Sequence, residues 1–200
     1  MLSRLVAVVL PLTCPGCGRP ADPVCDACAV GLRPAVAAPP PTGIDAWAAP
    51  FAYEGVAREL VARVKYRGAH AVTAWLASAM VVHLAPPMPA VVTWVPTTSA
   101  RKRERGFDHA EVLARQVASR LSRPARRMLA RGPGPSQTGL PASARRRGPS
   151  IEALRRAPAN VLLVDDVATT GASLTAAAAA LRAKGADRVV ALTAARTPAP

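Results

Sequence analysis

The segment Val161–Ser173 constrains the fold of this chain more than any other part of the sequence. Val161–Val164 is apolar at every position, which predicts a strand buried on both faces, as in a parallel sheet covered by helices. Asp165 and Asp166 follow at the expected end of that strand, the edge where open α/β sheets bind ligands. We therefore expect a parallel α/β sheet with a ligand site at this edge.

The small-residue loop after the two acids has the features of an anion site. It opens an alanine-rich helix, so its backbone N–H groups lie at a helix N-terminus, where anions bind. Gly171 would let the chain approach a phosphate closely, and Thr169, Thr170 and Ser173 add hydroxyl donors. The acids would then face hydroxyls or a bound cation of the same ligand, which suits a sugar phosphate. The alternative is a polar turn in which Asp166 only caps the helix.

The rest of the chain alternates predicted strands with predicted helices. Strands are predicted at Ala46–Tyr53, Val91–Val95 and Arg188–Ala194, and helices at Gly55–Arg67, Val72–Leu84 and from a capping box at Asp108. The proline- and glycine-rich stretch Gly132–Pro149 is expected to be a long excursion. This alternation predicts a doubly wound, mostly parallel sheet.

Four cysteines form two CxxC pairs that are separated by seven residues: Cys14, Cys17, Cys25 and Cys28. Two such turns complete a tetrahedral thiolate site, which predicts structural zinc in a short zinc ribbon. An iron–sulfur centre, two disulfides or a redox-active CxxC are the alternatives. A closed four-thiolate site would serve structure or recognition, not catalysis.

The chain is strongly basic, with a net charge of +14, and this predicts an acidic partner such as nucleic acid, nucleotide, polyphosphate or an anionic membrane surface. A codon bias that favours arginine together with alanine and proline is the alternative explanation. Only 4% of residues are aromatic, which argues against a large stacking platform for single strands. No apolar run is long enough to cross a membrane, and the first residues lack a signal-peptide cleavage site, so we expect a cytoplasmic protein without membrane insertion.

Val161–Ser173 resembles the phosphoribosyl pyrophosphate (PRPP) signature of type I phosphoribosyltransferases: apolar strand, Asp-Asp, Thr-Gly. A wider set of motifs resembles the ComF family, which includes competence-associated ComF proteins and GntX-like proteins. These motifs are the double CxxC, YEGVARELVARVKYRG, VPTTSARKRERGFDHAEVLA, SQTGL with a downstream arginine, and the PRPP signature.

The resemblance implies a type I phosphoribosyltransferase-like α/β fold, doubly wound and mostly parallel, with a small N-terminal four-cysteine zinc ribbon. Residues 1–45 would form the zinc-ribbon region and a Pro-rich linker, and residues 46–200 the phosphoribosyltransferase-like domain. Family members are linked with single-stranded DNA handling in natural transformation, so DNA and competence proteins are implied partners beside PRPP.

The resemblance also assigns site residues. Asp165 and Asp166 would face the ribose hydroxyls, the following loop would hold the 5′-phosphate, and Mg²⁺ would accompany the pyrophosphate. The implied PRPP-binding residues are Asp165, Asp166, Ala168, Thr169, Thr170, Gly171, Ala172 and Ser173. Candidates for the pyrophosphate or anion loop are Thr97, Thr98, Arg101, Lys102, Arg103 and Arg105, with Arg101–Arg105 expected on a mobile loop. The zinc ligands would be the four cysteines.

The chain departs from the family pattern at two places. Asp108-His109 stands where the family usually reads Asn-Gln, and Gly148 stands where it tends to have Asn after the arginine aligned with Arg145. Losing these amides calls into question the hydrogen bonds they would make, although Asp108 can still cap a helix. A histidine on the first turn of a helix is more often solvated than catalytic, and we expect this of His109.

Three functions remain open from the sequence. The first is a phosphoribosyltransferase (a transferase) that acts on an unknown acceptor. The second is a non-catalytic nucleic-acid-binding module with a degenerate phosphoribosyltransferase fold. The third is a conventional purine or pyrimidine salvage enzyme, against which the N-terminal ribbon and the lack of a recognisable base-binding hood argue.

Overall fold

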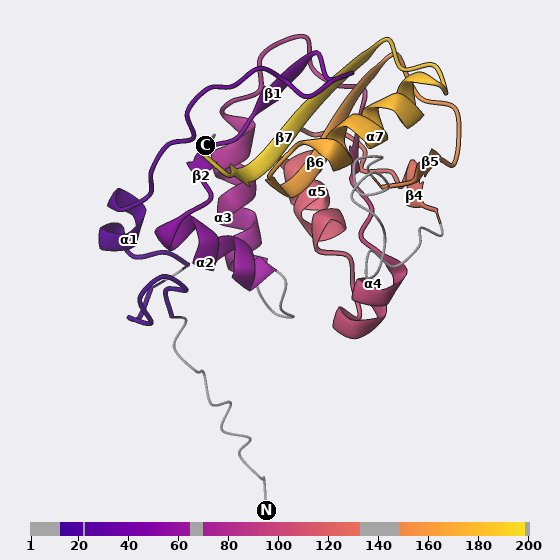
Figure 1. The fold of residues 1–200 in the computed structure, drawn as a ribbon. Coiled ribbons are helices and arrows are strands. Elements are labelled where there is room, and N and C mark those ends of the chain that lie inside the picture. The colour runs from indigo at the N-terminus through magenta and orange to yellow at the C-terminus, as the bar shows by residue number, and fades with distance from the viewer. Residues whose placement is uncertain (1–12, 22, 65–69, 133–148, 199–200) are drawn as a thin grey trace, which may run out of the picture.

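A parallel sheet forms the centre of the computed structural model, which describes residues 13–21, 23–64, 70–132 and 149–198 (Figure 1). The strand order is β1-β7-β6-β3, and β2 also pairs with β7. The strands are β1 (Ala46–Ala48), β2 (Phe51–Ala52), β3 (Val91–Trp94), β6 (Asn160–Ala168) and β7 (Arg188–Arg196). Each of these pairings is parallel, as the alternation of strands and helices predicts.

The longest pairing joins β6 to β7, from Asn160 opposite Arg188 to Ala168 opposite Arg196. β3 is shorter and leaves β6 after Trp94, which lies opposite Val164. β6 therefore extends beyond the end of β3, and its last residues lie at an edge that only β7 continues to support. This step in the sheet creates the candidate ligand site.

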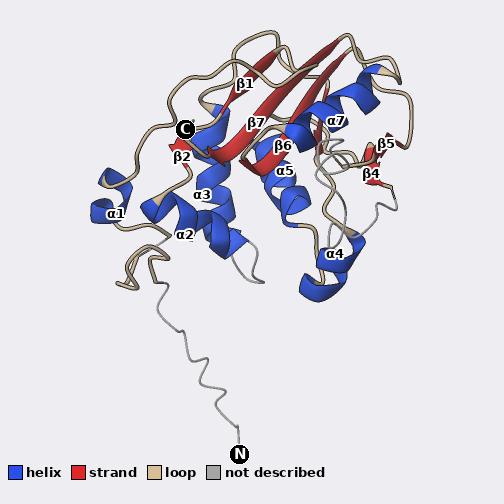
Figure 2. Cartoon of the chain, in the orientation of Figure 1, coloured by secondary structure: helices blue, strands red, loops and turns tan. Residues whose placement is uncertain are grey.

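Helices cover both faces of the sheet (Figure 2). On one face α2 (Gly55–Val64), α3 (His70–Val81) and α5 (His109–Arg120) pack against a cluster that includes Leu162 and Val164. On the other face α7 (Ala172–Arg182) packs against a cluster that includes Val161 and Leu163. Alternate residues of β6 thus enter two different cores, which is why every position of this apolar run is buried.

Four short elements were not predicted from the sequence. They are α1 (Asp26–Val30), α4 (Ser99–Arg105) and an antiparallel pair of β4 (Leu129–Arg131) with β5 (Ile151–Ala153). Strands of three residues carry too little alternation to be recognised by period. The pair encloses the predicted excursion, whose residues 133–148 lie outside the described part of the chain, together with SQTGL, Arg145 and Gly148.

The predicted helices are confirmed with shifted ends. The second helix begins at His70 and ends at Val81 instead of spanning Val72–Leu84. The N–H of His83 donates to the carbonyl of Met80, and the N–H of Leu84 donates to the carbonyl of Val81. These hydrogen bonds close a turn there, ahead of two consecutive prolines. The predicted end of the first helix at Arg67 and the first 12 residues of the chain fall outside the described residues.

The Pro-rich segment that precedes β1 packs along α7. The guanidinium of Arg182 donates from Nε to the carbonyl of Gly43 at 2.9 Å and pairs with Asp45. Asp45 also accepts the backbone N–H of Val189 at 2.7 Å. The segment is thus fixed to the α7 face of the sheet by charged hydrogen bonds. Among the described residues, no helix is long and apolar enough to span a membrane.

Candidate functional site

The four cysteines gather into one cluster at the N-terminal end of the described chain. One sulfur from each of Cys14, Cys17, Cys25 and Cys28 lies within 4.8 Å of the others, and none of the four forms a disulfide. The first pair lies on a tight turn, and the second lies at the start of α1, with Cys25 as the residue before the helix. A disulfide framework is therefore not what this structure contains, and the arrangement suits a tetrahedral metal ion.

The turn around Gly16 brings the two cysteine pairs together. A Cβ at this position would lie 2.9 Å from Sγ of Cys28 and 3.0 Å from Cγ1 of Val56, so only glycine fits. Val56 belongs to α2, so the same glycine also seats the cluster against the body of the protein. Cys14 and Cys28 are buried in this contact, whereas Cys17 is exposed.

The surroundings of the sulfurs favour a thiolate at Cys14. Burial by itself raises the pKa of this thiol. Backbone N–H groups of Cys25, Gly16 and Cys17 more than offset this effect and lower the pKa to about 6. Burial and hydrogen bonds to the neighbouring sulfurs raise the pKa of the Cys28 thiol to about 12. Four sulfurs with at least one stabilised thiolate are a donor set that fits zinc.

Asp165 and Asp166 lie within β6, beyond the last β3 pair, and not at the end of the strand as predicted. β6 continues to Ala168 because β7 supports it to that point. Oδ1 of Asp165 accepts the N–H of Asp166 at 2.9 Å, and Oδ1 of Asp166 accepts the N–H of Val167 at 2.8 Å. The first oxygen of each carboxylate is therefore fixed by the next residue's backbone.

The two acids have unequal surroundings. Burial, then the charge of Asp166 and also that of Asp108, raise the pKa of Asp165 well above its usual range. Asp166 contacts the imidazole of His109, with Nε2 and Oδ2 3.1 Å apart. The pair thus combines a carboxyl that resists ionisation with a carboxylate that has a basic neighbour.

His109 is not the solvated residue that its place on a first helical turn predicted. Its side chain is only 9% exposed. α5 packs against both β3 and β6, so its first residue is pressed against the exposed edge of the sheet. The periodicity of α5 identifies its buried face but cannot show which strand end that face meets.

Asp108 joins the start of α5 to the loop after β3. Its carboxylate accepts the N–H of Ala110 at 3.2 Å, which confirms the predicted helix cap, and the N–H of Thr97 at 3.2 Å. Asp108 and His109 therefore both make hydrogen bonds to this edge, although they lack the amides of the family pattern.

The loop between β6 and α7 is built around Gly171, which has a φ of +74° and caps the helix. A Cβ there would lie 2.8 Å from Cγ of Pro41, so the Pro-rich segment also requires glycine. Thr169 and Thr170 are exposed, and Ser173 is half-buried. The alternative in which Asp166 caps the helix is excluded, since the cap has no side-chain hydrogen bond.

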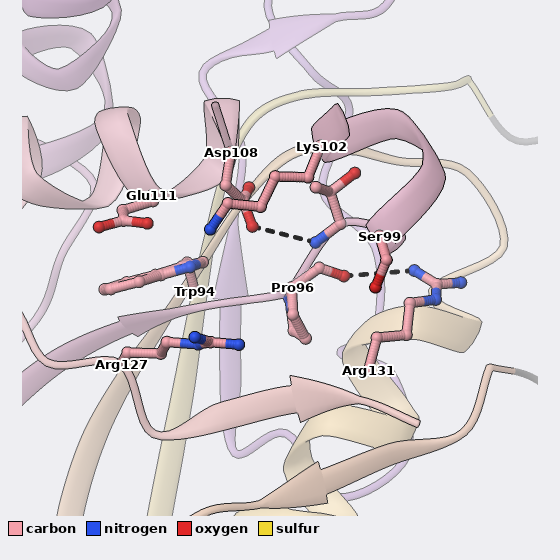
Figure 3. A pocket seen from close by; sticks show the side chains of 9 residues that line it. Trp94, Pro96, Ser99, Lys102, Asp108, Glu111, Arg127 and Arg131 are labelled. Atoms are coloured by element: carbon pink, nitrogen blue, oxygen red, sulfur yellow. Dashed lines mark hydrogen bonds between the residues drawn. The ribbon is translucent and has the colours of Figure 1, made fainter. Parts of the chain in front are cut away.

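A pocket lies at the carboxyl end of β3, with a volume of about 60 Å³, enough for a few water molecules or a small oxyanion (Figure 3). Side chains from the loop after β3, from α4, from α5 and from the segment around β4 line it. These residues are Trp94, Pro96, Thr97, Ser99, Lys102, Asp108, Glu111, Arg127 and Arg131.

Three basic side chains dominate this pocket: Lys102, Arg127 and Arg131. Its acids are engaged elsewhere, because Glu111 pairs with Arg115 at 2.8 Å and Asp108 accepts two backbone N–H groups. Nη1 of Arg131 donates to the carbonyl of Pro96 at 3.3 Å, which holds this guanidinium beside the loop. Neither Arg127 nor Arg131 was predicted from the sequence as a site residue; the pairing of β4 with β5 positions Arg131.

The predicted mobile loop at Arg101–Arg105 is a helix, α4. Lysine, arginine and glutamate are good helix formers, and Gly106, with a φ of +78°, ends the helix by donating to the carbonyl of Lys102 at 2.8 Å. Thr97 and Thr98 precede it directly after β3, as expected. Lys102 and Arg103 are both exposed, and of the two only Lys102 lines the pocket.

Comparison with known proteins gives distant likenesses only. No protein-family model and no curated protein matches the chain. It is similar to a solved structure of the allosteric regulatory enzyme of purine biosynthesis, at 19% identity and a TM-score of 0.46, over 67% of this chain and 30% of that one. Glutamine PRPP amidotransferase from B. subtilis matches at 21% identity and 0.40, over 66% of this chain and 26% of that one.

A third likeness is to orotate phosphoribosyltransferase from Aeropyrum pernix, at 20% identity and a TM-score of 0.37, over 70% of this chain and 76% of that one. This chain thus spans about a third or less of the first two proteins. The likenesses are too distant to identify a family.

We expect purified protein to contain about one zinc ion per chain by metal analysis. Gly16→Ala should lower zinc affinity about tenfold in a chelator competition, because its methyl group would collide with the Cys28 sulfur. Gly31→Ala is the matched control, since a Cβ there meets no atom closer than 3.4 Å. Equal zinc affinity in the two variants would contradict this description of the turn.

Asp165→Asn should stabilise the protein by about 1 kcal/mol at pH 8, which is about 2–4 °C in the melting temperature of a chain of this size. A raised folded-state pKa means that the folded protein holds this proton more tightly than the unfolded chain does. Wild type therefore loses stability as pH rises through the raised pKa, and the variant does not. The gain should shrink toward about pH 3, below the ordinary pKa of an aspartate, where both states are protonated.

Thermal unfolding across this pH range measures the effect, with Asp187→Asn, at an exposed position, as the control. An Asp165→Asn variant less stable than wild type at pH 8 would show that the carboxylate carries no such penalty.

Proposed function

We propose that this chain is a phosphoribosyltransferase-like protein that binds PRPP together with Mg²⁺ and carries one structural zinc ion. The observation that supports this most is the meeting of three ligand-type features at one sheet edge. Two carboxylates lie on the part of β6 that extends beyond β3, a glycine-capped loop follows β6 at the N-terminus of α7, and a basic pocket lies at the carboxyl end of β3. Open parallel sheets bind their ligands at this edge.

In this proposal the acids face the ribose hydroxyls. Each of Asp165 and Asp166 has one oxygen fixed by a backbone N–H, so the second oxygen has a defined direction. A carboxylate accepts hydrogen bonds from hydroxyl groups, and two neighbouring acids match the two adjacent hydroxyls of a ribose. The residues proposed for PRPP are Asp165, Asp166, Ala168, Thr169, Thr170, Gly171, Ala172 and Ser173.

The loop before α7 would hold the 5′-phosphate. Thr169 and Thr170 are exposed there, and the backbone N–H groups of the first turn of this 11-residue helix have no partner within the helix. The helix dipole favours an anion at the same place.

The basic pocket would take the pyrophosphate. Lys102, Arg127 and Arg131 line a space of the size of a small oxyanion, beside Thr97. Asp108 also lines this pocket, and its charge acts on Asp165, so this residue connects the pocket to the acids. Thr98, Arg101, Arg103 and Arg105 remain candidates for the same anion.

The corresponding reaction is substitution at the ribose C1. A nucleophilic atom of the acceptor forms a bond to C1, the C1–O bond to pyrophosphate breaks, and the acceptor loses a proton. Bound Mg²⁺ would neutralise charge on the departing pyrophosphate. The basic side chains of the pocket would stabilise the same charge, and the acids would hold the sugar in place.

The finer proposal is a ComF-type role in handling single-stranded DNA during competence. The net charge of +14 supports an acidic macromolecule as partner, and the zinc cluster lies at the opposite end of the chain from the PRPP signature. A non-catalytic nucleic-acid-binding module is the alternative, in which the same edge no longer binds PRPP.

Isothermal titration of the zinc-loaded protein with PRPP, with and without Mg²⁺, tests the proposed function. We expect Mg²⁺-dependent binding, lost by at least a hundredfold in Asp165→Asn/Asp166→Asn because both hydroxyl acceptors are changed. Asp187→Asn should bind like wild type. Absence of binding in wild type would favour the nucleic-acid-binding alternative, and normal binding in the double variant would remove the assignment of the acids.

Removing a pocket cation should weaken the pyrophosphate part of the ligand. Arg127→Gln is expected to lower affinity for inorganic pyrophosphate about tenfold, the effect of one lost charge-assisted contact. Arg155→Gln is the control, since Arg155 is exposed and does not line the pocket. Equal affinities for the two variants would show that pyrophosphate does not bind in this pocket.

A further inference from the structure

His109 occupies a position that the proposed function does not use. It is the first residue of α5, its side chain is 9% exposed, and Nε2 lies 3.1 Å from Oδ2 of Asp166. Asp166 is itself only 13% exposed at its side chain. A buried histidine in contact with a buried carboxylate at a candidate ligand edge is rarely there for solubility, because both groups lose hydration.

The two oxygens of Asp166 are held from two directions. Oδ1 accepts the N–H of Val167 at 2.8 Å, and Oδ2 faces the imidazole. Contacts on both oxygens restrict rotation of the carboxylate plane about the Cβ–Cγ bond more than a single contact does. An oxygen in this plane still has a second lone pair that can accept a ligand hydroxyl.

α5 itself is anchored at this point. Asp108, the residue before His109, accepts N–H groups from Ala110 and from Thr97, so the first turn of the helix cannot shift relative to the loop after β3. Through this anchor the imidazole is fixed in the frame of the sheet. The contact between His109 and Asp166 therefore ties the orientation of this carboxylate to the position of α5.

We propose that His109 is the positioning residue of the PRPP edge: its Nε2–H donates to Oδ2 of Asp166 and holds this carboxylate as an oriented acceptor for a ribose hydroxyl. The inference rests on the proposed function for the identity of the ligand. The contact between the two side chains does not depend on it.

Two substitutions separate positioning from packing. His109→Leu fills similar space without a donor, and we expect it to weaken Mg²⁺-dependent PRPP binding about tenfold, as loss of an outer partner does at other liganding groups. His109→Gln keeps an N–H donor on a side chain of similar reach and should restore affinity to within about threefold of wild type. His83→Leu, at an exposed histidine, is the control.

A spectroscopic measurement tests the contact between His109 and Asp166 in the absence of PRPP. Nitrogen-15 NMR of the imidazole at pH 8 should show His109 as a single Nε2–H tautomer in wild type and as a mixture in Asp166→Ala. Titration and NMR together decide the case. Failure of wild type to bind PRPP would refute the proposed function, while the tautomer would still report whether His109 holds Asp166.

The proposal is overturned if wild-type His109 is a mixture of tautomers, or if His109→Leu binds PRPP as wild type does. It is also overturned if the Leu and Gln variants lose affinity equally, since the side-chain donor would then be irrelevant. Thermal unfolding of each variant accompanies the titration, so that a misfolded protein is recognised before its affinity is compared.

Discussion

The pairing of β6 with β7 is the interaction on which the rest of the structure depends. It extends to Ala168, past the end of β3, and so supports two carboxylates on backbone that has lost one neighbouring strand. An extended strand with one open edge gives the acids a fixed backbone and an accessible surface at once. Without β7 this stretch would be a loop, and the directions of the two carboxylates would not be defined.

Much of this architecture follows from local sequence. Val161–Val164 predicts a strand buried on both faces because no position in it is polar, and helices on both sides of the sheet confirm this. The start of α5 can be predicted in the same way, since Asp108 is a strong cap followed by helical periodicity. The cysteine spacing predicts a cluster of sulfurs without any knowledge of the fold, and the sulfurs do converge.

What the sequence could not supply are distances between segments far apart in the chain. His109 reads as a solvated residue on a first turn, and only the packing of α5 against the sheet places it beside Asp166. Arg131 lies on a three-residue strand, too short to show a period, and its place in the basic pocket depends on β5. The family resemblance implied a mobile loop for the basic run before Gly106, but its lysine, arginine and glutamate residues are good helix formers and the run is α4.

The contact between Pro41 and Gly171 makes two positions, far apart in the sequence, interdependent in evolution. A side chain at Gly171 meets both an unfavourable backbone conformation and the proline ring, so a smaller residue at position 41 relieves only one of these costs. Changes at the two positions should be non-additive, and a lineage that replaces the proline gains little freedom at the glycine. Among homologues, position 41 can therefore drift while position 171 remains fixed, which is asymmetric rather than mutual covariation.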